Sequence, residues 1–127
     1  MNGEINTMYD PSRIERKILD RVRKIVGEKD LKHMIRLFLI NAPKKLESAF
    51  AGLKAGNYKE VAAAAHSLIS SAGTLGATGM QKMAAKVEFS AGNKEEDVPQ
   101  FLLELQKSYD KIKPTLEKER KSLESRP

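Results

Sequence analysis

The sequence predicts an all-α protein, an antiparallel up-down four-helix bundle with an additional N-terminal helix. Three observations support this. Apolar residues recur at intervals of three and four along most of the 127 residues, which is the period of helices buried on one face. No long segment alternates apolar and polar residues with the period of a strand. The connections between periodic segments are short, which makes successive helices antiparallel neighbours.

The additional N-terminal helix is expected to open at Asp10-Pro11. This pair is typical of an N-cap followed by a proline at the first helical position. Its apolar stripe consists of Ile14, Ile18, Val22 and Ile25. Gly27 is expected to end the helix just after Ile25.

A longer helix is expected over about 30–55, with Pro43 inside it. The apolar spacing resumes after Pro43, at Leu46 and Phe50. Because proline removes one backbone hydrogen bond, we expect a single helix bent at this point. Two helices separated by a break are the alternative.

The remaining helices have recognisable starting signals. Asn57 and Glu60 form an N-x-x-E capping arrangement. Asp97 is expected to cap the last helix, which we expect Pro114 to bend rather than end. The expected helices cover about 57–75, 79–91 and 97 onward, with a tight turn at 76–79 and a polar loop at 92–96.

Composition excludes several functional classes. The chain has no cysteine and two histidines, His33 and His66, so disulfides and thiolate chemistry are absent and no metal-site spacing occurs. No apolar run is long enough to cross a bilayer, and the first ten residues do not resemble a signal peptide. We therefore expect one cytoplasmic domain over 1–127, with its core at about 11–123, that is monomeric and does not bind membranes.

The net charge of +6 raises the question of nucleic acid. The basic residues gather near both ends of the chain, among apolar and acidic residues at helical spacing, and no nucleic-acid motif accompanies them. The pattern favours solvated faces of amphipathic helices over a nucleic-acid surface. A basic surface also suits an acidic protein partner.

His66 is the most informative residue. The buried stripe of its helix is expected to consist of Val61, Ala65, Leu68, Ala72 and Leu75. At about 100° per residue, His66 lies well over 90° from the centre of that stripe, so its imidazole is expected to point outward. The residues that share its face at helical spacing are Ala62, Ile69, Ser70 and Gly73.

This face carries small side chains, including a glycine inside a helix, where glycine costs about 0.5–1 kcal/mol relative to alanine. Ala62, Ser70 and Ser71 are small as well. A strip of small residues around an exposed histidine suits close approach by another protein. The alternative is that these residues let the helix pack closely against its neighbour and that His66 is an ordinary surface residue.

Counting outward from the turn places Glu88 beside His66. If the turn is centred near Ala77, His66 lies eleven residues before it and Glu88 eleven after. A carboxylate there can accept the Nδ1 proton, which leaves Nε2 as the nucleophile. The alternative is that Glu88 is simply solvated. His33 has no comparable surroundings and is expected to be an incidental surface residue.

The sequence around His66 resembles a known family. The run from Ala65-His66-Ser67-Leu68 to Leu75-Gly76-Ala77 is similar to the histidine-containing phosphotransfer (HPt) domain of bacterial two-component phosphorelays, whose motif reads A-H-x-L-K-G followed by small residues and L-G-A. Further similarity comes from 37–43, from Ala55-Gly56-Asn57 and from Val87-Glu88, so the resemblance spans about 14–123.

The resemblance implies a four-helix bundle in which His66 is the phospho-acceptor. It places Glu88, Ser70 and Ser71 beside the histidine, and it implies that receiver domains dock on a surface including Ala62, Ile69 and Gly73. Two residues depart from the family motif. Its lysine three residues after the histidine is Ile69 here, and its glycine four residues after is Ser70.

The expected function is that of a phosphorelay intermediate, which takes a phosphoryl group from a receiver aspartyl phosphate onto His66 and passes it to another receiver. Its expected partners are response-regulator receiver domains and a sensor (hybrid) histidine kinase. The chain shows neither a glycine-rich phosphate loop nor an acidic metal-binding triad, so Mg²⁺ is expected only on the receiver, with no cofactor and no enzymatic activity here. The alternatives are a helical docking module that is not phosphorylated and a basic nucleic-acid binder.

Overall fold

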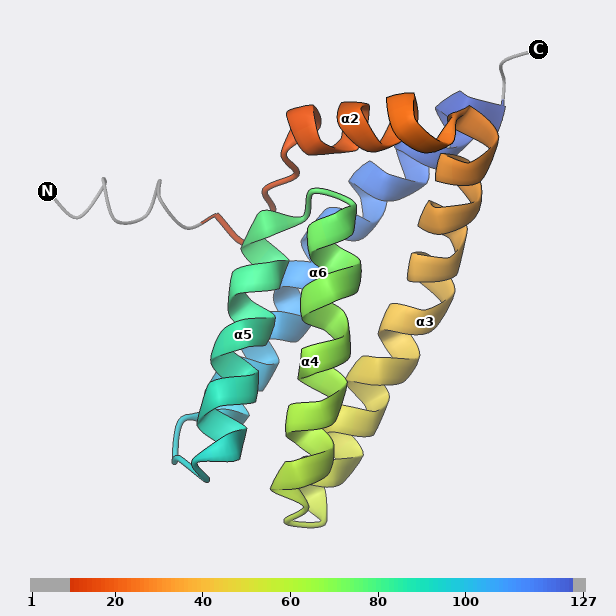
Figure 1. Cartoon of the computed structure of the whole chain (residues 1–127). Coiled ribbons are helices and arrows are strands. Elements are labelled where there is room, and N and C mark those ends of the chain that lie inside the picture. Colours follow the sequence, from red (N-terminus) through yellow and green to blue (C-terminus); the bar gives the residue numbers. More distant parts are fainter. Residues whose placement is uncertain (1–9, 125–127) are drawn as a thin grey trace, which may run out of the picture.

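The computed structural model describes residues 10–124, and within this part of the chain it contains five helices and no strand (Figure 1). The helices are α2 (Arg16–Val26), α3 (Glu28–Lys54), α4 (Tyr58–Thr74), α5 (Thr78–Gly92) and α6 (Val98–Glu124). This confirms the predicted all-α fold.

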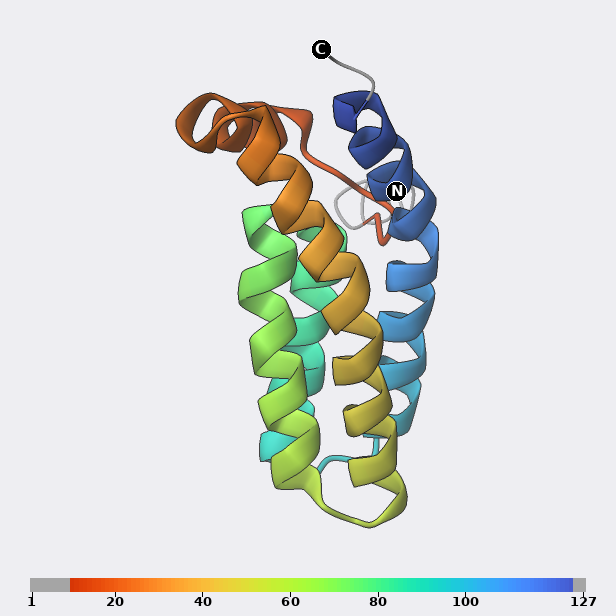
Figure 2. The ribbon, with the colours of Figure 1, turned by 90° about the vertical axis from the view of Figure 1, so that its right-hand side faces the viewer.

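Helices α3 to α6 form the four-helix bundle. Each packs against the next along the chain, α6 closes the bundle against α3, and α4 and α6 lie diagonally opposite without contact. Helix α2 lies across one end of the bundle, over the start of α3 and the turn after α4 (Figures 1 and 2). The additional N-terminal helix is therefore confirmed, and it covers an end of the bundle.

All five helices contribute to the core. Representative side chains are Leu19, Ile35, Leu68, Met83 and Leu105, each at most 1% exposed. Burying a large aliphatic side chain stabilises the folded state by about 1.5–3 kcal/mol. Within residues 10–124, every buried side-chain nitrogen or oxygen has a hydrogen-bond partner, so no polar side chain in this part of the core is unsatisfied.

Asp10 does not open a helix, contrary to the sequence expectation. Its carboxylate accepts hydrogen bonds from the backbone N–H of Ser12, at 2.9 Å, and from the Ser12 hydroxyl, at 2.7 Å. These bonds lower the pKa of the Asp10 carboxyl and form a local turn that competes with helix formation. The first described helix begins at Arg16.

The segment 10–15 instead crosses the turn between α4 and α5. The N–H of Glu15 donates to the carbonyl of Gly76 at 2.7 Å. Gly76 has a φ of +81°, and a Cβ there would meet the Glu15 backbone at 2.8 Å. A Cβ on Gly79 would overlap the carbonyl of Asp10. Both glycines are therefore required by the close approach of this segment.

The other helices follow the sequence expectations closely. Helix α3 is continuous through Pro43 and α6 through Pro114, so α3 is one helix and not two. Asn57 caps α4, because its side-chain oxygen accepts from the N–H of Glu60 at 3.1 Å. The reciprocal bond of a capping box does not form, since the N–H of Asn57 donates to the Gly52 carbonyl.

None of the helices within residues 10–124 is long and apolar enough to cross a membrane.

Candidate functional site

His66 lies on the outer face of α4, and its side chain is 73% exposed. The opposite face of α4 carries the predicted buried residues, including Val61, Leu68 and Ala72. Because a helix has a fixed angular period, burying that stripe forces position 66 outward. The solvent-facing imidazole thus follows from the packing of α4.

Glu88, on α5, lies beside His66. Its Oε2 atom is 2.8 Å from Nδ1 of the imidazole. The two helices form an antiparallel hairpin, which places residues equidistant from the turn side by side. The carboxylate, 38% exposed, is held next to a ring that is itself mostly exposed.

This contact determines which ring nitrogen is nucleophilic. An ionised carboxylate only accepts hydrogen bonds, so Nδ1 carries the proton that the bond requires. In the neutral ring Nε2 then has a free lone pair. Within residues 10–124, Nε2 forms no hydrogen bond. The site therefore presents an oriented nucleophile with nothing from the described chain in front of it.

The predicted docking residues surround His66, with different degrees of burial. Ser70 is exposed, whereas Ala62, Ile69 and Gly73 are half-buried. Ala62 and Ile69 also pack against the core. The surface next to the imidazole therefore consists of small side chains and the outer edge of one isoleucine.

Gly73 has a packing partner that the sequence analysis did not identify. A Cβ at this position would overlap the side-chain amide of Gln81 on α5. The glycine therefore makes room for Gln81 to lie against α4. A signal for this contact was present in the sequence, because Gly73 and Gln81 lie four residues on either side of Ala77, as His66 and Glu88 lie eleven.

Ser71 faces a different part of the molecule. Its hydroxyl donates to the carbonyl of Ser67 at 3.2 Å, back along α4. Ser71 lines a groove of about 540 Å³ between α3 and α4, with Met34 and Leu37 on the α3 wall. Ser71 is thus directed toward α3, and of the two serines only Ser70 shares the face of His66.

His33 lies exposed on α3 and forms no hydrogen bond or ion pair within the described residues. In the same part of the chain, no group of three or more histidine and acidic side chains is placed to hold a metal ion. Of the two histidines, only His66 has an adjacent carboxylate.

Comparisons with known proteins agree with this arrangement. Residues 33–115 match the model of the Hpt domain family. Among solved structures, the chain is similar to histidine-containing phosphotransfer protein B (HptB) from Pseudomonas aeruginosa PAO1, with a TM-score of 0.81, 18% identity, and coverage of 86% of this chain and 95% of that chain. This likeness shows a shared fold. A search of curated proteins finds no match.

Proposed function

The chain belongs to the Hpt domain family, and from this premise we propose that it is a phosphorelay intermediate. His66 accepts a phosphoryl group from the aspartyl phosphate of one receiver domain and passes it to another. The observation that carries the proposal is the exposed imidazole whose Nδ1 lies 2.8 Å from the Glu88 carboxylate. This geometry supports a nucleophile directed toward a partner.

The transfer forms one bond and breaks one. The Nε2 lone pair attacks phosphorus, and the bond from phosphorus to the aspartyl oxygen breaks, which releases a carboxylate on the receiver. His66 becomes a phosphoramidate and its ring gains a positive charge. Because Nδ1–H donates to Glu88, the carboxylate stabilises that charge as it develops. The reverse sequence returns the phosphoryl group to a second receiver.

The receiver supplies the remaining parts of the reaction. Phosphoryl transfer requires in-line positioning and neutralisation of the phosphoryl charge. Ile69 and Ser70, near His66, bring no cation to the phosphoryl group. We assign the metal ion and the neutralising cation to the receiver, so this chain acts as a carrier and substrate. A sensor histidine kinase stands further upstream in such a relay.

The test is phosphoryl transfer from purified receiver domains of the same genome, phosphorylated with acetyl phosphate. Wild type should acquire acid-labile label, and His66→Gln should acquire none while keeping its helical circular dichroism spectrum. His33→Gln is the matched control and should label as wild type does. Equal labelling of wild type and His66→Gln would exclude the assignment. Saturable receiver binding without label would favour the docking module instead.

A further inference from the structure

Helix α2 carries two kinds of cation. Two arginines form ion pairs. Arg16 lies 2.7 Å from Glu119 and 3.7 Å from Asp20. Arg23 lies 3.8 Å from Asp20 and 4.0 Å from Glu28. The other three cations are exposed and form no ion pair within residues 10–124: Lys17, Arg21 and Lys24. We call these three residues the α2 basic stripe.

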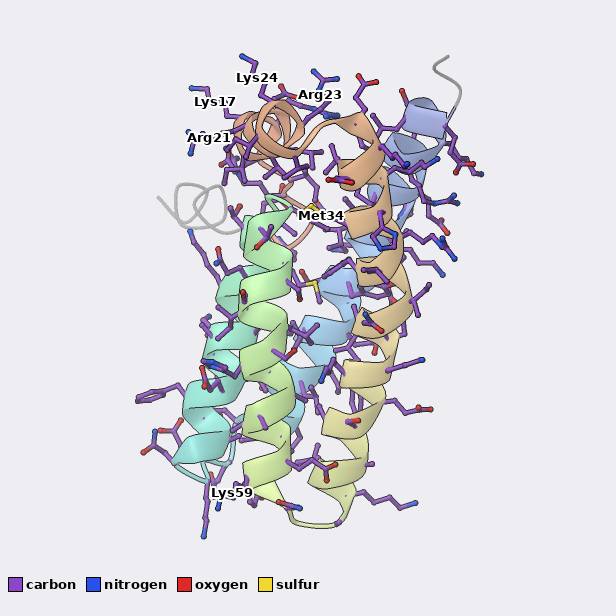
Figure 3. All side chains as sticks on the ribbon, turned by 45° about the vertical axis from the view of Figure 1, so that its right-hand side comes forward. Lys17, Arg21, Arg23, Lys24, Met34 and Lys59 are labelled. Carbon is purple, nitrogen blue, oxygen red and sulfur yellow. The ribbon has the colours of Figure 1, made fainter. Side chains whose placement is uncertain are left out.

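The α2 basic stripe occupies one face of the helix. Its residues follow i, i+4, i+7 spacing, which brings them within about 60° of one another. Figure 3 shows Lys17, Arg21 and Lys24 projecting outward from α2 at the end of the molecule. Asp20 lies on the flank beside the two paired arginines. None of the three forms an ion pair with a carboxylate of α2, although Lys17 lies near Glu15 at the start of the helix and, after Arg13, helps to lower the pKa of that carboxyl.

The position of α2 brings the stripe near the His66 face. Helix α2 packs against α4, and Figure 2 shows it projecting past α4 on the side of the bundle away from α6. Nine residues separate His66 from Leu75 at the end of α4, about 14 Å of helix, and the helix-to-helix spacing adds about 8–10 Å. The axis of α2 therefore lies roughly 23 Å from His66.

A protein docked on His66 extends most of the way to α2. A standard interface covers about 800 Å² on each partner, equivalent to a patch about 32 Å across. Centred on His66, such a patch extends about 16 Å toward α2, so the axis of α2 lies about 7 Å beyond the edge of the patch. The stripe would therefore lie just outside the contact patch, where its charge acts on an approaching partner over a distance and not through a direct contact.

A further cation lies on the other side of His66. Lys59 is seven residues earlier on α4, which is two turns along the same face. It is exposed, forms no ion pair within residues 10–124, and lies at the opposite end of the molecule from α2 in Figure 3. His66 is therefore flanked by positive charge at both ends of α4.

A phosphorylated receiver has the complementary charge. Its reactive surface bears an aspartyl phosphate and the carboxylates that hold its metal ion. We propose that the α2 basic stripe, from just outside the contact patch, steers the acidic surface of the phosphorylated receiver toward His66. This inference rests on the proposed function and assigns the stripe a role in docking, separate from the chemistry. Charges at or near the edge of an interface act mainly on association rates and on the salt dependence of those rates.

The test compares two triple variants of equal charge change. One replaces the stripe, Lys17→Gln/Arg21→Gln/Lys24→Gln. The control, Lys107→Gln/Lys118→Gln/Lys121→Gln, replaces three exposed lysines on α6, which has no contact with α4. The probe is the receiver that labels His66 fastest, phosphorylated with acetyl phosphate. The measurement is the second-order rate of transfer at limiting receiver, in about 0.05 M and about 0.5 M salt.

At low salt the stripe variant should transfer about tenfold more slowly than wild type, and the control variant less than twofold more slowly. High salt should bring all three rates together, and the single-turnover rate at saturating receiver should be the same in each. Equal loss in both triple variants, or no loss in the stripe variant, would overturn the proposal. So would stripe-dependent binding to phosphatidylserine vesicles with unchanged transfer.

The proposed function and the role of the stripe can fail independently. The proposed function requires label on His66 at saturating receiver, where steering has no influence. Binding of the beryllofluoride-activated receiver to His66→Gln, measured by titration calorimetry, reports docking without transfer. The same titration is made with His66→Gln that also carries the three stripe substitutions. A salt-dependent affinity that is lost with these substitutions supports the stripe whether or not label appears. Equal affinities with and without them overturn the proposal.

Discussion

The hydroxyl of Tyr109 on α6 lies 3.4 Å from the carbonyl oxygen of Leu39 on α3. Leu39 is four residues before Pro43, so its carbonyl is the acceptor that a helical N–H at position 43 would have used. The buried tyrosine donates to this acceptor from the neighbouring helix. The cross-helix bond thereby replaces the one that proline removes.

Replacing Tyr109 should therefore have an effect that depends on Pro43. We expect Tyr109→Phe to lower the free energy of unfolding by about 1 kcal/mol in the wild type. In a Pro43→Ala background the loss should be markedly smaller, because the alanine N–H restores the helical bond. Urea denaturation of the four proteins in this double-mutant cycle measures the coupling. Equal losses in both backgrounds would show that the two residues act independently.

Stability should also depend on pH through Tyr109. Burial, with smaller contributions from Glu117 and Asp110, raises the pKa of its hydroxyl above the ordinary 10.0. The folded state thus favours the protonated phenol. The contribution of this protonated phenol to the free energy of unfolding is complete below pH 10. It is lost as the pH rises through the pKa of the folded state, because the unfolded chain releases the proton first.

The measurement is the difference in unfolding free energy between wild type and Tyr109→Phe at about pH 8 and about pH 11. This difference should shrink at the higher pH. Lysine titration affects both proteins alike and cancels. A difference that does not change with pH would contradict the assignment.

Glu88 should influence both the tautomer of His66 and the transfer rate. Glu88→Ala removes the acceptor of Nδ1–H, so the neutral ring should distribute its proton between both nitrogens. The single-turnover rate at saturating receiver should fall about tenfold, which corresponds to about 1.4 kcal/mol in the barrier. Nitrogen-15 chemical shifts of the ring report the tautomer.

Glu88→Gln is the matched variant. Its amide oxygen still accepts from Nδ1–H, but it offers no negative charge to the ring during transfer. We expect it to keep the wild-type tautomer and to transfer at a rate between those of wild type and Glu88→Ala. Wild-type transfer rates in both variants would show that Glu88 is a solvated helix residue with no role in transfer.

Gly73 should be dispensable for the fold. Alanine there gains about 0.5–1 kcal/mol of helix propensity and displaces only the flexible end of Gln81. Gly73→Ala should thus leave the unfolding free energy unchanged or slightly higher, and Gly73→Ala/Gln81→Ala should raise it further. Transfer at limiting receiver should slow in Gly73→Ala, since the displaced amide moves into the docking surface. A clear loss of stability would show instead that the fold depends on the close contact between Gly73 and Gln81.

Ser70 should obstruct docking slightly. Its side chain is exposed on the face of His66; its backbone carbonyl accepts from the Thr74 hydroxyl at 2.9 Å. Ser70→Gly should accelerate transfer at limiting receiver more than threefold, without a change at saturating receiver. Ser71→Ala, directed toward α3, is the control and should leave both rates unchanged. Identical rates in wild type and Ser70→Gly would show that the hydroxymethyl group is accommodated.

Much of the candidate site could be predicted from the sequence because helical geometry is periodic. The outward position of His66 follows from the stripe that includes Leu68, and the position of Glu88 follows from counting away from Ala77. Both inferences need only the 3.6-residue period and a hairpin of short connection. In the structure His66 is exposed, and the Glu88 carboxylate contacts its imidazole.

The features that were missed depend on contacts between distant segments. Asp10 and Pro11 match the sequence pattern of a helix start. In the structure this segment crosses the α4–α5 turn instead, and the residues around Asp10 give no indication of that contact. The resemblance implies that Ser71 lies beside His66, but Ser71 is about 100° from Ser70 around the helix and lines the groove toward α3. Likewise, nothing in the local pattern indicates that Phe89 is 66% exposed.

The hydrogen bond from Glu15 to Gly76 has a consequence for residues far from it. Inserting or deleting one residue in the α4–α5 turn would rotate α5 by about 100° relative to α4, so Val87 or Phe89 would face the imidazole in place of Glu88. The backbone of segment 10–15 lies directly on that turn, so close that a Cβ on Gly76 or Gly79 would collide with it. A stretch of chain about 15 Å along α4 from His66 thus maintains the alignment of its acid–base pair.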